Sequence, residues 1–331
     1  MRRPTSCLVP VLTLAVLAAP AAAQRPVATY SIVARDSATG QLGVAVQSHW
    51  FSVGPLVPWA AAGVGAVATQ SFVEVSYGPV GLELMAAGRT AEQALRGLVA
   101  ADPDEAVRQV GMVDARGNAA AHTGALAIRE AGHRVGQGYA VHANMMLNPT
   151  VPTAMARAYE AAEGDLAARL LAALEAAQAE GGDIRGRQSA ALLVVSGEPT
   201  GKPWLDRIFD LRVEDHPEPV AELQRLTHLA RAYRHMNAGD EAAVAGNFAR
   251  ALAEYAAAGA MVPDEATNGE MVFWHAVMAV HAGQVDAALP LFRRAFAQDP
   301  NWRELLRRLP AVGQFPDDPA LLARMLGAGG G

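Results

Sequence analysis

The chain has 331 residues, of which 51% are hydrophobic and 18% charged, and its formal net charge is −6. A chain of this length and apolar content can form one or two domains with buried cores. The basic residues are scattered and form no stripe of lysine and arginine, so the sequence predicts no nucleic-acid partner. Cys7 is the only cysteine and lies close to the N-terminus.

The N-terminal segment has the features of a cleavable secretion signal. Two arginines open it, an apolar run follows, and the alanines at 21–23 offer a cleavage site before Gln24. The apolar run is too short to span a membrane, and no later segment is predicted to span one. We therefore predict an exported protein with a signal peptide over residues 1–23. Its removal would also remove Cys7, which excludes disulfides, a cysteine nucleophile and thiolate metal sites in the mature chain.

Residues 28–217 mix predicted strands with predicted helices. Each group of strands is followed by a segment in which apolar residues recur at helical spacing, 77–102 after the first group and 151–180 after the second. This order favours two antiparallel sheets between layers of helices over a doubly wound parallel sheet, which needs strict alternation of strand and helix. The runs read as strands are TYSIVARD (29–36), QLGVAVQS (41–48), GVGAVATQSF (63–72), RQVGMVDARGNAAAHTG (108–124), GYAVHANMM (138–146), RQSAALLVVS (187–196) and FDLRVEDHP (209–217).

Two local patterns in this block make further predictions. Thr90, followed three residues later by Gln93, predicts a capping box at the start of a helix. Gly43 and Ala45 occupy one face of the second strand, and such small residues indicate that another layer packs closely against that face.

Residues 218–326 are helical in pattern and contain a repeat. AGDEAAVAGNFARALAEYAAAGAMVPD (238–264) and NGEMVFWHAVMAVHAGQVDAALPLFRRAFAQDP (268–300) place alanine, aromatic, alanine and proline in the same order. The spacing is that of the second helix and exit of a tetratricopeptide repeat. We predict a tetratricopeptide-like helical domain over 218–326 that needs a neighbour to cover its end, and a disordered tail over 327–331.

Thr29, at the head of the first predicted strand, has two interpretations. Threonine is a good strand former, so a purely structural role is plausible. A threonine hydroxyl can also act as a nucleophile when a base activates it, and an N-terminal threonine has its own α-amine as that base. The second interpretation requires that no residue precede Thr29 in the mature chain.

The residues around Thr29 belong to a longer set of motifs. TYSIVARDSATGQLGVAVQSHWFSVGPLVPWAAAGVGAVATQSFVEVSYGPVGLELM, QVGMVDARGNAAAHTG, GDIRGRQSAALLVV and DLRVEDHPEPVAEL, in this order, resemble the domain-of-unknown-function family 1028 over about 28–224. The resemblance implies a four-layer αββα sandwich like that of N-terminal-nucleophile (Ntn) hydrolases over 28–217. Many members begin with Met-Thr, so loss of the methionine would expose a threonine that matches Thr29.

By analogy of fold, the resemblance implies that the protein hydrolyses a C–N amide bond. In this chain, cleavage after Ala23 would leave QRPVA ahead of Thr29. A further cut at the Ala28–Thr29 bond, by self-cleavage or by a protease, would therefore be needed.

Three other polar residues are candidates for a catalytic role. Gln70 follows an apolar strand, and its amide could donate to a developing oxyanion. His122 ends another strand and is either an acid–base group or a structural histidine. Asn144 has an apolar neighbourhood and would need hydrogen-bond partners if buried.

The loop GGDIRGRQS, residues 181–189, is the candidate substrate-binding segment. Asp183, Arg185, Arg187 and Gln188 crowd around a glycine in it, and His49 stands where many family members have a basic residue. Arginine side chains suit a carboxylate, so the loop could recognise an anionic substrate end. The alternative is that Asp183 and an arginine pair with each other and shape the loop.

No cofactor or metal is predicted, because the histidines lack ligand spacing and no phosphate-binding loop is present. The leading hypothesis is an exported hydrolase that acts on a small-molecule or peptide-like substrate. The first competitor is a non-catalytic protein that binds a ligand or cell-wall fragment and docks a protein partner through its helical repeats. The second is a scaffold in which the αββα domain forms homo-oligomers.

Overall fold

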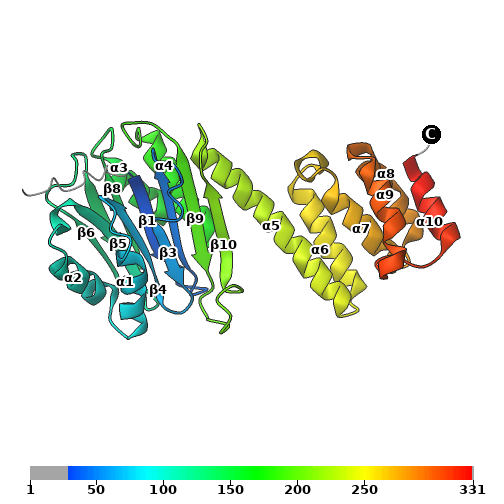
Figure 1. Ribbon diagram of the computed structural model, residues 1–331, viewed down its shortest axis with the longest axis horizontal. Helices are drawn as coiled ribbons and strands as arrows, with labels where there is room; N and C mark the ends of the chain where they lie inside the picture. Colours follow the sequence, from blue (N-terminus) through cyan, green and yellow to red (C-terminus); the bar gives the residue numbers. More distant parts are fainter. Residues whose placement is uncertain (1–28, 330–331) are drawn as a thin grey trace, which may run out of the picture.

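The computed structural model describes residues 29–329, in which an α+β region is followed by a helical region (Figure 1). The predicted signal peptide and the last two residues of the chain lie outside the described residues. Both sheets are antiparallel, as the sequence predicted.

The larger sheet has six strands in the order β10-β9-β2-β1-β8-β7. These strands are β10 (Arg207–Val213), β9 (Ser189–Val195), β2 (Leu42–Ser48), β1 (Thr29–Arg35), β8 (Tyr139–Asn144) and β7 (Gly132–Gly136). The smaller sheet has the order β3-β4-β5-β6. Its strands are β3 (Pro58–Ala61), β4 (Gly65–Ser71), β5 (Arg108–Asp114) and β6 (Ala119–Thr123).

The two sheets face each other across an apolar layer. Because side chains alternate along a strand, every second residue of β1 and β2 points into this layer, and Val33, Val44 and Val46 do so. From the smaller sheet, Ala66 and Ala68 of β4 meet them. The interior between the sheets is therefore built largely from valine and alanine, and polar side chains there need partners of their own.

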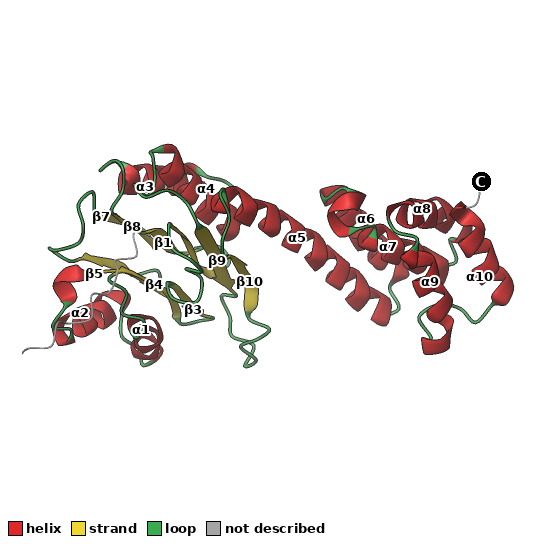
Figure 2. Ribbon diagram, turned by 45° about the horizontal axis from the view of Figure 1, so that its top comes forward, coloured by secondary structure: helices red, strands yellow, loops and turns green. Residues whose placement is uncertain are grey.

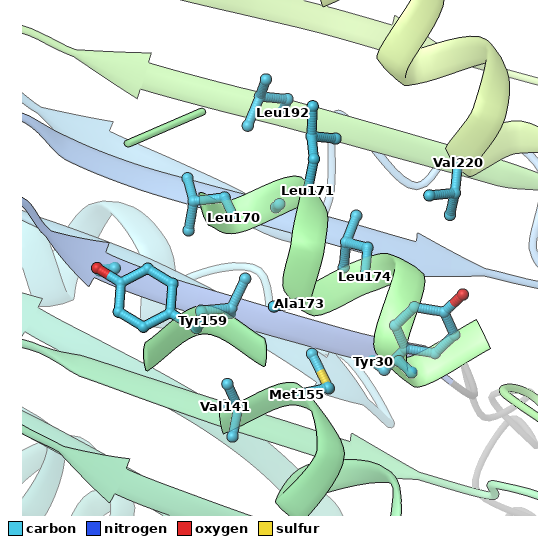
Figure 3. Close-up of a cluster of buried hydrophobic side chains, with 14 of the residues drawn as sticks. Tyr30, Val141, Met155, Tyr159, Leu170, Leu171, Ala173, Leu174, Leu192 and Val220 are labelled. Carbon is cyan, nitrogen blue, oxygen red and sulfur yellow. The ribbon is translucent and has the colours of Figure 1, made fainter. Parts of the chain in front are cut away.

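Helices cover the outer faces of both sheets (Figure 2). Against the larger sheet lie α3 (Val151–Ala161) and α4 (Leu166–Ala179), whose Leu170 and Leu174 join the buried cluster of Figure 3. Against the smaller sheet lie α1 (Tyr77–Ala86) and α2 (Ala91–Ala101). A Cβ on Gly43 would lie 2.7 Å from Leu170 Cδ1, so the close layer predicted from the small residues of β2 is α4.

The helix α5 (Pro219–Val244) connects the two regions. Its first turns place Val220 and Leu223 in the core under the larger sheet, whereas Ala232 and Met236 pack with the helices that follow. The predicted boundary at 217–218 thus marks the start of a continuous helix, and the two regions share that helix. None of the helices in the described part of the chain is both long enough and apolar enough to cross a membrane.

The remaining helices have a core of their own, to which Phe273, Phe292 and Met325 contribute. These helices are α6 (Phe248–Met261), α7 (Glu270–His281), α8 (Val285–Gln298), α9 (Asn301–Arg308) and α10 (Pro319–Leu326). The structure differs from the predicted tail at its first residues, because Gly327–Gly329 form a 3₁₀ turn. Ala328 is buried there and its carbonyl accepts a 2.9 Å hydrogen bond from Arg293 Nε, which holds the turn in place.

Candidate functional site

Four polar residues form a row across the inner face of the larger sheet, at one end of its central strands. The strand register places Thr29 of β1 between Asn144 of β8 and Ser48 of β2, and Ser48 opposite Ser189 of β9. All four side chains are buried. The hydroxyl Oγ1 of Thr29 lies 3.2 Å from Oγ of Ser48 and donates to it. Thr29 therefore begins its strand within a set of polar side chains.

Gln70 of β4 reaches this row from the opposite sheet. Its Nε2 donates to the backbone carbonyl of Thr29 at 3.0 Å and to that of His142 at 3.3 Å. The same nitrogen lies 2.7 Å from Oε1 of Gln109, and the hydroxyl of Ser31 donates to Oε1 of Gln70. Because the side chain is fully buried, these bonds replace the water that an exposed amide would bind. Gln70 thus joins the start of β1 to the smaller sheet.

Gln109 of β5 extends the same cluster. Its Oε1 accepts from Nδ2 of Asn144 at 2.9 Å, and its Nε2 donates to the carbonyl of Ala143 at 2.8 Å and to Oγ1 of Thr123 at 2.9 Å. Oδ1 of Asn144 is buried and has no hydrogen-bond partner among residues 29–329. An unpaired buried amide oxygen is costly, so the position of Asn144 is a feature that stability alone does not explain.

A buried histidine lies beside this cluster. His142 of β8 is opposite Ser31 in the strand register, and its ring packs against the backbone of Gly111. Burial lowers the pKa of His142 to about 3, so the imidazole is neutral at physiological pH. Neither ring nitrogen makes a well-formed hydrogen bond in the described part of the chain, although the backbone of Ala68 lies near the ring and favours its protonated form. In the folded protein the His142 ring is therefore neutral at physiological pH and cannot act as a cation.

The loop before β9 is organised around Asp183. Its buried carboxylate accepts from the backbone N–H groups of His49 and Arg185, each at 2.9 Å, and pairs with the Arg185 guanidinium at 3.0 Å. The pairing and the burial together match the alternative in which Asp183 and an arginine shape the loop. Since the loop runs directly into Ser189, it borders the row that contains Thr29.

The other loop candidates are held by neighbouring groups. Arg187 forms an ion pair with Glu218, and its carbonyl lies 3.3 Å from Nδ1 of His49. The carbonyl of Gln188 accepts from the backbone N–H of His216 at 2.8 Å. The structure therefore brings all the predicted substrate-binding residues into one loop cluster, with the arginine side chains already facing carboxylates of this chain.

His122 lies apart from the other catalytic candidates. Its ring is on the outer face of the smaller sheet, where Nε2 is 3.0 Å from a carboxylate oxygen of Glu105. The next residue, Thr123, points inward and bonds Gln109, because neighbouring strand residues face opposite sides of a sheet. The grouping of His122 with Thr29, Gln70 and Asn144 is corrected accordingly.

The predicted site residues do not include these members of the cluster: Ser31, Ser48, Ser189, Gln109 and His142. Each is a polar residue inside an otherwise apolar strand, which is the signal that could have identified them. Ser31 also shares the face of Thr29, since the two residues are two positions apart in one strand. Within the described residues, no group of three or more histidine, cysteine, aspartate or glutamate side chains is placed to hold a metal ion.

Comparisons with known proteins identify a family that matches the first region of the chain. A search of curated proteins finds no match. The solved structure of protein SPO2555 from Silicibacter pomeroyi, described as family-model DUF1028, is similar with 31% sequence identity and a TM-score of 0.55. The similarity covers 61% of this chain and 89% of that one. The model of the family of unknown function DUF1028 matches residues 29–223, from the first residue of β1 to the first turns of α5. The chain therefore belongs to the DUF1028 family.

Proposed function

We propose that this protein is an exported Ntn-type hydrolase that cleaves a C–N amide bond with Thr29 as its nucleophile. The observation that carries the proposal is the position of Thr29 as the first residue of β1, inside a polar cluster that crosses between two sheets. The order of layers, with helices outside two facing antiparallel sheets, supports an Ntn-like αββα fold. A tetratricopeptide-like helical region follows it.

The proposed reaction begins once the Ala28–Thr29 bond is broken. The free α-amine of Thr29 takes the proton from its own Oγ1, and Oγ1 attacks the carbonyl carbon of the substrate amide. The amine then passes that proton to the leaving nitrogen as the C–N bond breaks, leaving an ester on Thr29. Water hydrolyses the ester and restores the hydroxyl. No cofactor is needed for this sequence of steps.

The geometry revises the roles of the supporting amides. Nε2 of Gln70 already faces the carbonyl of Thr29, the carbonyl of His142 and Oε1 of Gln109, so Gln70 is better suited to position Thr29 than to bind an oxyanion. Asn144 lies opposite Thr29 in the register, and within residues 29–329 its Nδ2 makes one hydrogen bond, to Gln109. We assign its second N–H to the oxyanion of the tetrahedral intermediate.

A second candidate function is ligand binding without catalysis. The observation that favours it is the burial of Thr29, whose side chain has no exposed surface in the described structure. A nucleophile must contact its substrate, so the hydrolase requires that cleavage at Ala28–Thr29 open this end of the sheet. A binding protein has no such requirement, and its loop around Asp183 would then serve as a fixed part of the ligand site.

Intact mass spectrometry of the full-length gene product after export from a bacterial host separates the two functions. The hydrolase predicts a mature chain that starts at Thr29, and the binding protein predicts one that starts stably at Gln24. The mature protein is then treated with a β-lactone probe, which acylates an activated N-terminal threonine. We expect labelling of the wild type and of Thr29→Ser, and no labelling of Thr29→Ala. A wild-type chain that starts at Thr29 yet resists the probe would exclude the nucleophilic role.

A further inference from the structure

A groove in the helical region has the form of a binding site. It has a cavity volume of about 790 Å³ and lies among α5, α6, α7 and the loop at residues 313–314. This part of the molecule is separate from the two sheets and from Thr29 (Figure 1). Pockets of this size hold small ligands or the side chains of a peptide.

The walls of the groove are aromatic and apolar. Tyr233, Phe248, Tyr255 and Trp274 line it together with two methionines. Aromatic faces attract cations as well as apolar groups, because the ring face carries partial negative charge. The wall is therefore suited to a ligand that has both an apolar part and a positive charge.

Two carboxylates give the groove its charge. Glu270 of α7 accepts a 2.5 Å hydrogen bond from the Tyr233 hydroxyl, and Asp240 of α5 accepts one from the Tyr255 hydroxyl. A hydroxyl donor leaves the negative charge of a carboxylate uncompensated. Neither Asp240 nor Glu270 forms an ion pair with any cationic side chain of residues 29–329, and no arginine or lysine lines the groove.

Neighbouring carboxylates show the contrast. Glu254 on α6 lies 2.7 Å from a ring nitrogen of His235, and Asp264 pairs with Arg294 at 2.8 Å. These two carboxylates are matched by cations from this chain, whereas Asp240 and Glu270 face the groove with hydroxyl partners alone among the described residues. Charge complementarity calls for a cation supplied by a partner.

Exposed apolar residues lie at the rim of the groove. Val244 is 92% exposed at the end of α5, and Phe248 at the start of α6 is 39% exposed. On the other side, Val312 is 69% exposed next to the lining residue Gly313. An apolar surface along the rim of the groove suits an extended segment better than a compact amine.

We infer that this groove binds a basic, partly apolar peptide segment of a partner protein. A lysine or arginine of the segment pairs with Asp240 and Glu270, and its apolar side chains pack on the aromatic wall and the exposed valines. The inference does not depend on the chemistry proposed for Thr29. Each outcome of its test is likewise separate from processing at Ala28–Thr29.

The test measures binding by fluorescence anisotropy with the full-length protein. The probe is a short fluorescein-labelled peptide of alternating leucine and lysine, compared with one of alternating leucine and glutamate. Glu270→Gln and Asp240→Asn remove one charge each and keep the shape of the side chain. Glu265→Gln is the matched control, because Glu265 is exposed in the same region and does not line the groove. Circular dichroism melting checks that each variant is folded.

The expected result is binding of the lysine peptide that weakens at least about tenfold in Glu270→Gln and in Asp240→Asn. The control should bind within about twofold of wild type, because an isolated surface charge contributes little. Equal binding of the glutamate peptide, or equal weakening by the control, would overturn the inference. Binding of spermidine as tight as that of the peptide would also overturn it, in favour of a small amine.

Discussion

The side-chain amide of Gln70 donates to the backbone carbonyl of Thr29 at 3.0 Å, so a residue of the smaller sheet holds the first residue of the central strand of the larger one. Thr29 is therefore positioned by contacts from both sheets. Its neighbours in the register, Ser48 and Asn144, come from the two strands that flank β1. The position of the candidate nucleophile thus depends on the stacking of the two sheets as well as on its own strand.

Replacing Gln70 should show how much this link contributes to stability. Gln70→Leu keeps the volume but removes the side-chain partner of the Thr29 carbonyl and of the Ser31 hydroxyl, and it leaves Oε1 of Gln109 with Asn144 as its remaining donor. We expect the free energy of unfolding to fall by about 2–3 kcal/mol, measured by urea denaturation. Gln41→Leu is the control.

The side chain of Gln41 is half-buried and makes no hydrogen bond in the described part of the chain, so its replacement should change stability by less than about 0.5 kcal/mol. If both variants lost the same free energy of unfolding, the buried hydrogen bonds of Gln70 would contribute nothing beyond the general effect of replacing glutamine with leucine.

Much of the fold could be predicted from the sequence because local patterns decide it. Strand-like patterns located the strands of both sheets except β3 and β7, which are edge strands, and their grouping gave two antiparallel sheets with a helical region after them. The small residues of β2 indicated the close helix layer that α4 supplies. Family membership followed from motifs that cover the first region.

The candidate site was only partly predictable because long-range packing decides it. Periodicity shows that His122 and Thr123 face opposite sides of β6, but the pairing with β5 decides which one points inward. Gln70 and Thr29 are far apart in the chain, and only the stacking of the sheets brings them together. The sequence shows that the loop contains two arginines, but their pairing with Asp183 and Glu218 depends on side-chain placement.

The capping box predicted at the start of α2 is confirmed and can be measured. Oγ1 of Thr90 accepts from the backbone N–H of Gln93 at 3.2 Å, and the Gln93 side chain accepts from the N–H of Thr90 at 3.1 Å. We expect Thr90→Ala to lower the free energy of unfolding by about 1 kcal/mol in urea denaturation. Thr90→Ser keeps the acceptor and should stay near wild type. A serine variant as unstable as the alanine variant would rule out the cap as the cause.

The close contact between Gly111 and His142 predicts that substitutions at these two positions have strongly non-additive effects on stability. A Cβ on Gly111 would lie 2.6 Å from Cε1 and 2.7 Å from Nδ1 of the His142 ring. Gly111→Ala should therefore cost about 1–3 kcal/mol of stability by overpacking. In a His142→Ala background the ring is gone, so the same substitution should cost much less. Urea denaturation of the four proteins of this double-mutant cycle gives the coupling, and additive losses would contradict it.

The buried imidazole of His142 should make stability depend on pH. In the unfolded chain a histidine titrates near ~6.5, whereas burial lowers the pKa of folded His142 to about 3. Between these values the unfolded state binds a proton that the folded state does not, so stability falls as pH falls. The slope reaches about 1.4 kcal/mol per pH unit, or about 2 kcal/mol between roughly pH 7.5 and 5. We expect His142→Met, whose side chain is apolar and does not titrate, to lose this part of the slope. Burial also lowers the pKa of His133 and His275, but both remain in the variant, so the difference between the two urea-denaturation series reports on His142 together with its coupling to His133. Parallel series would show that His142 is protonated in the folded state, or that it lies in a wetter interior than the structure indicates.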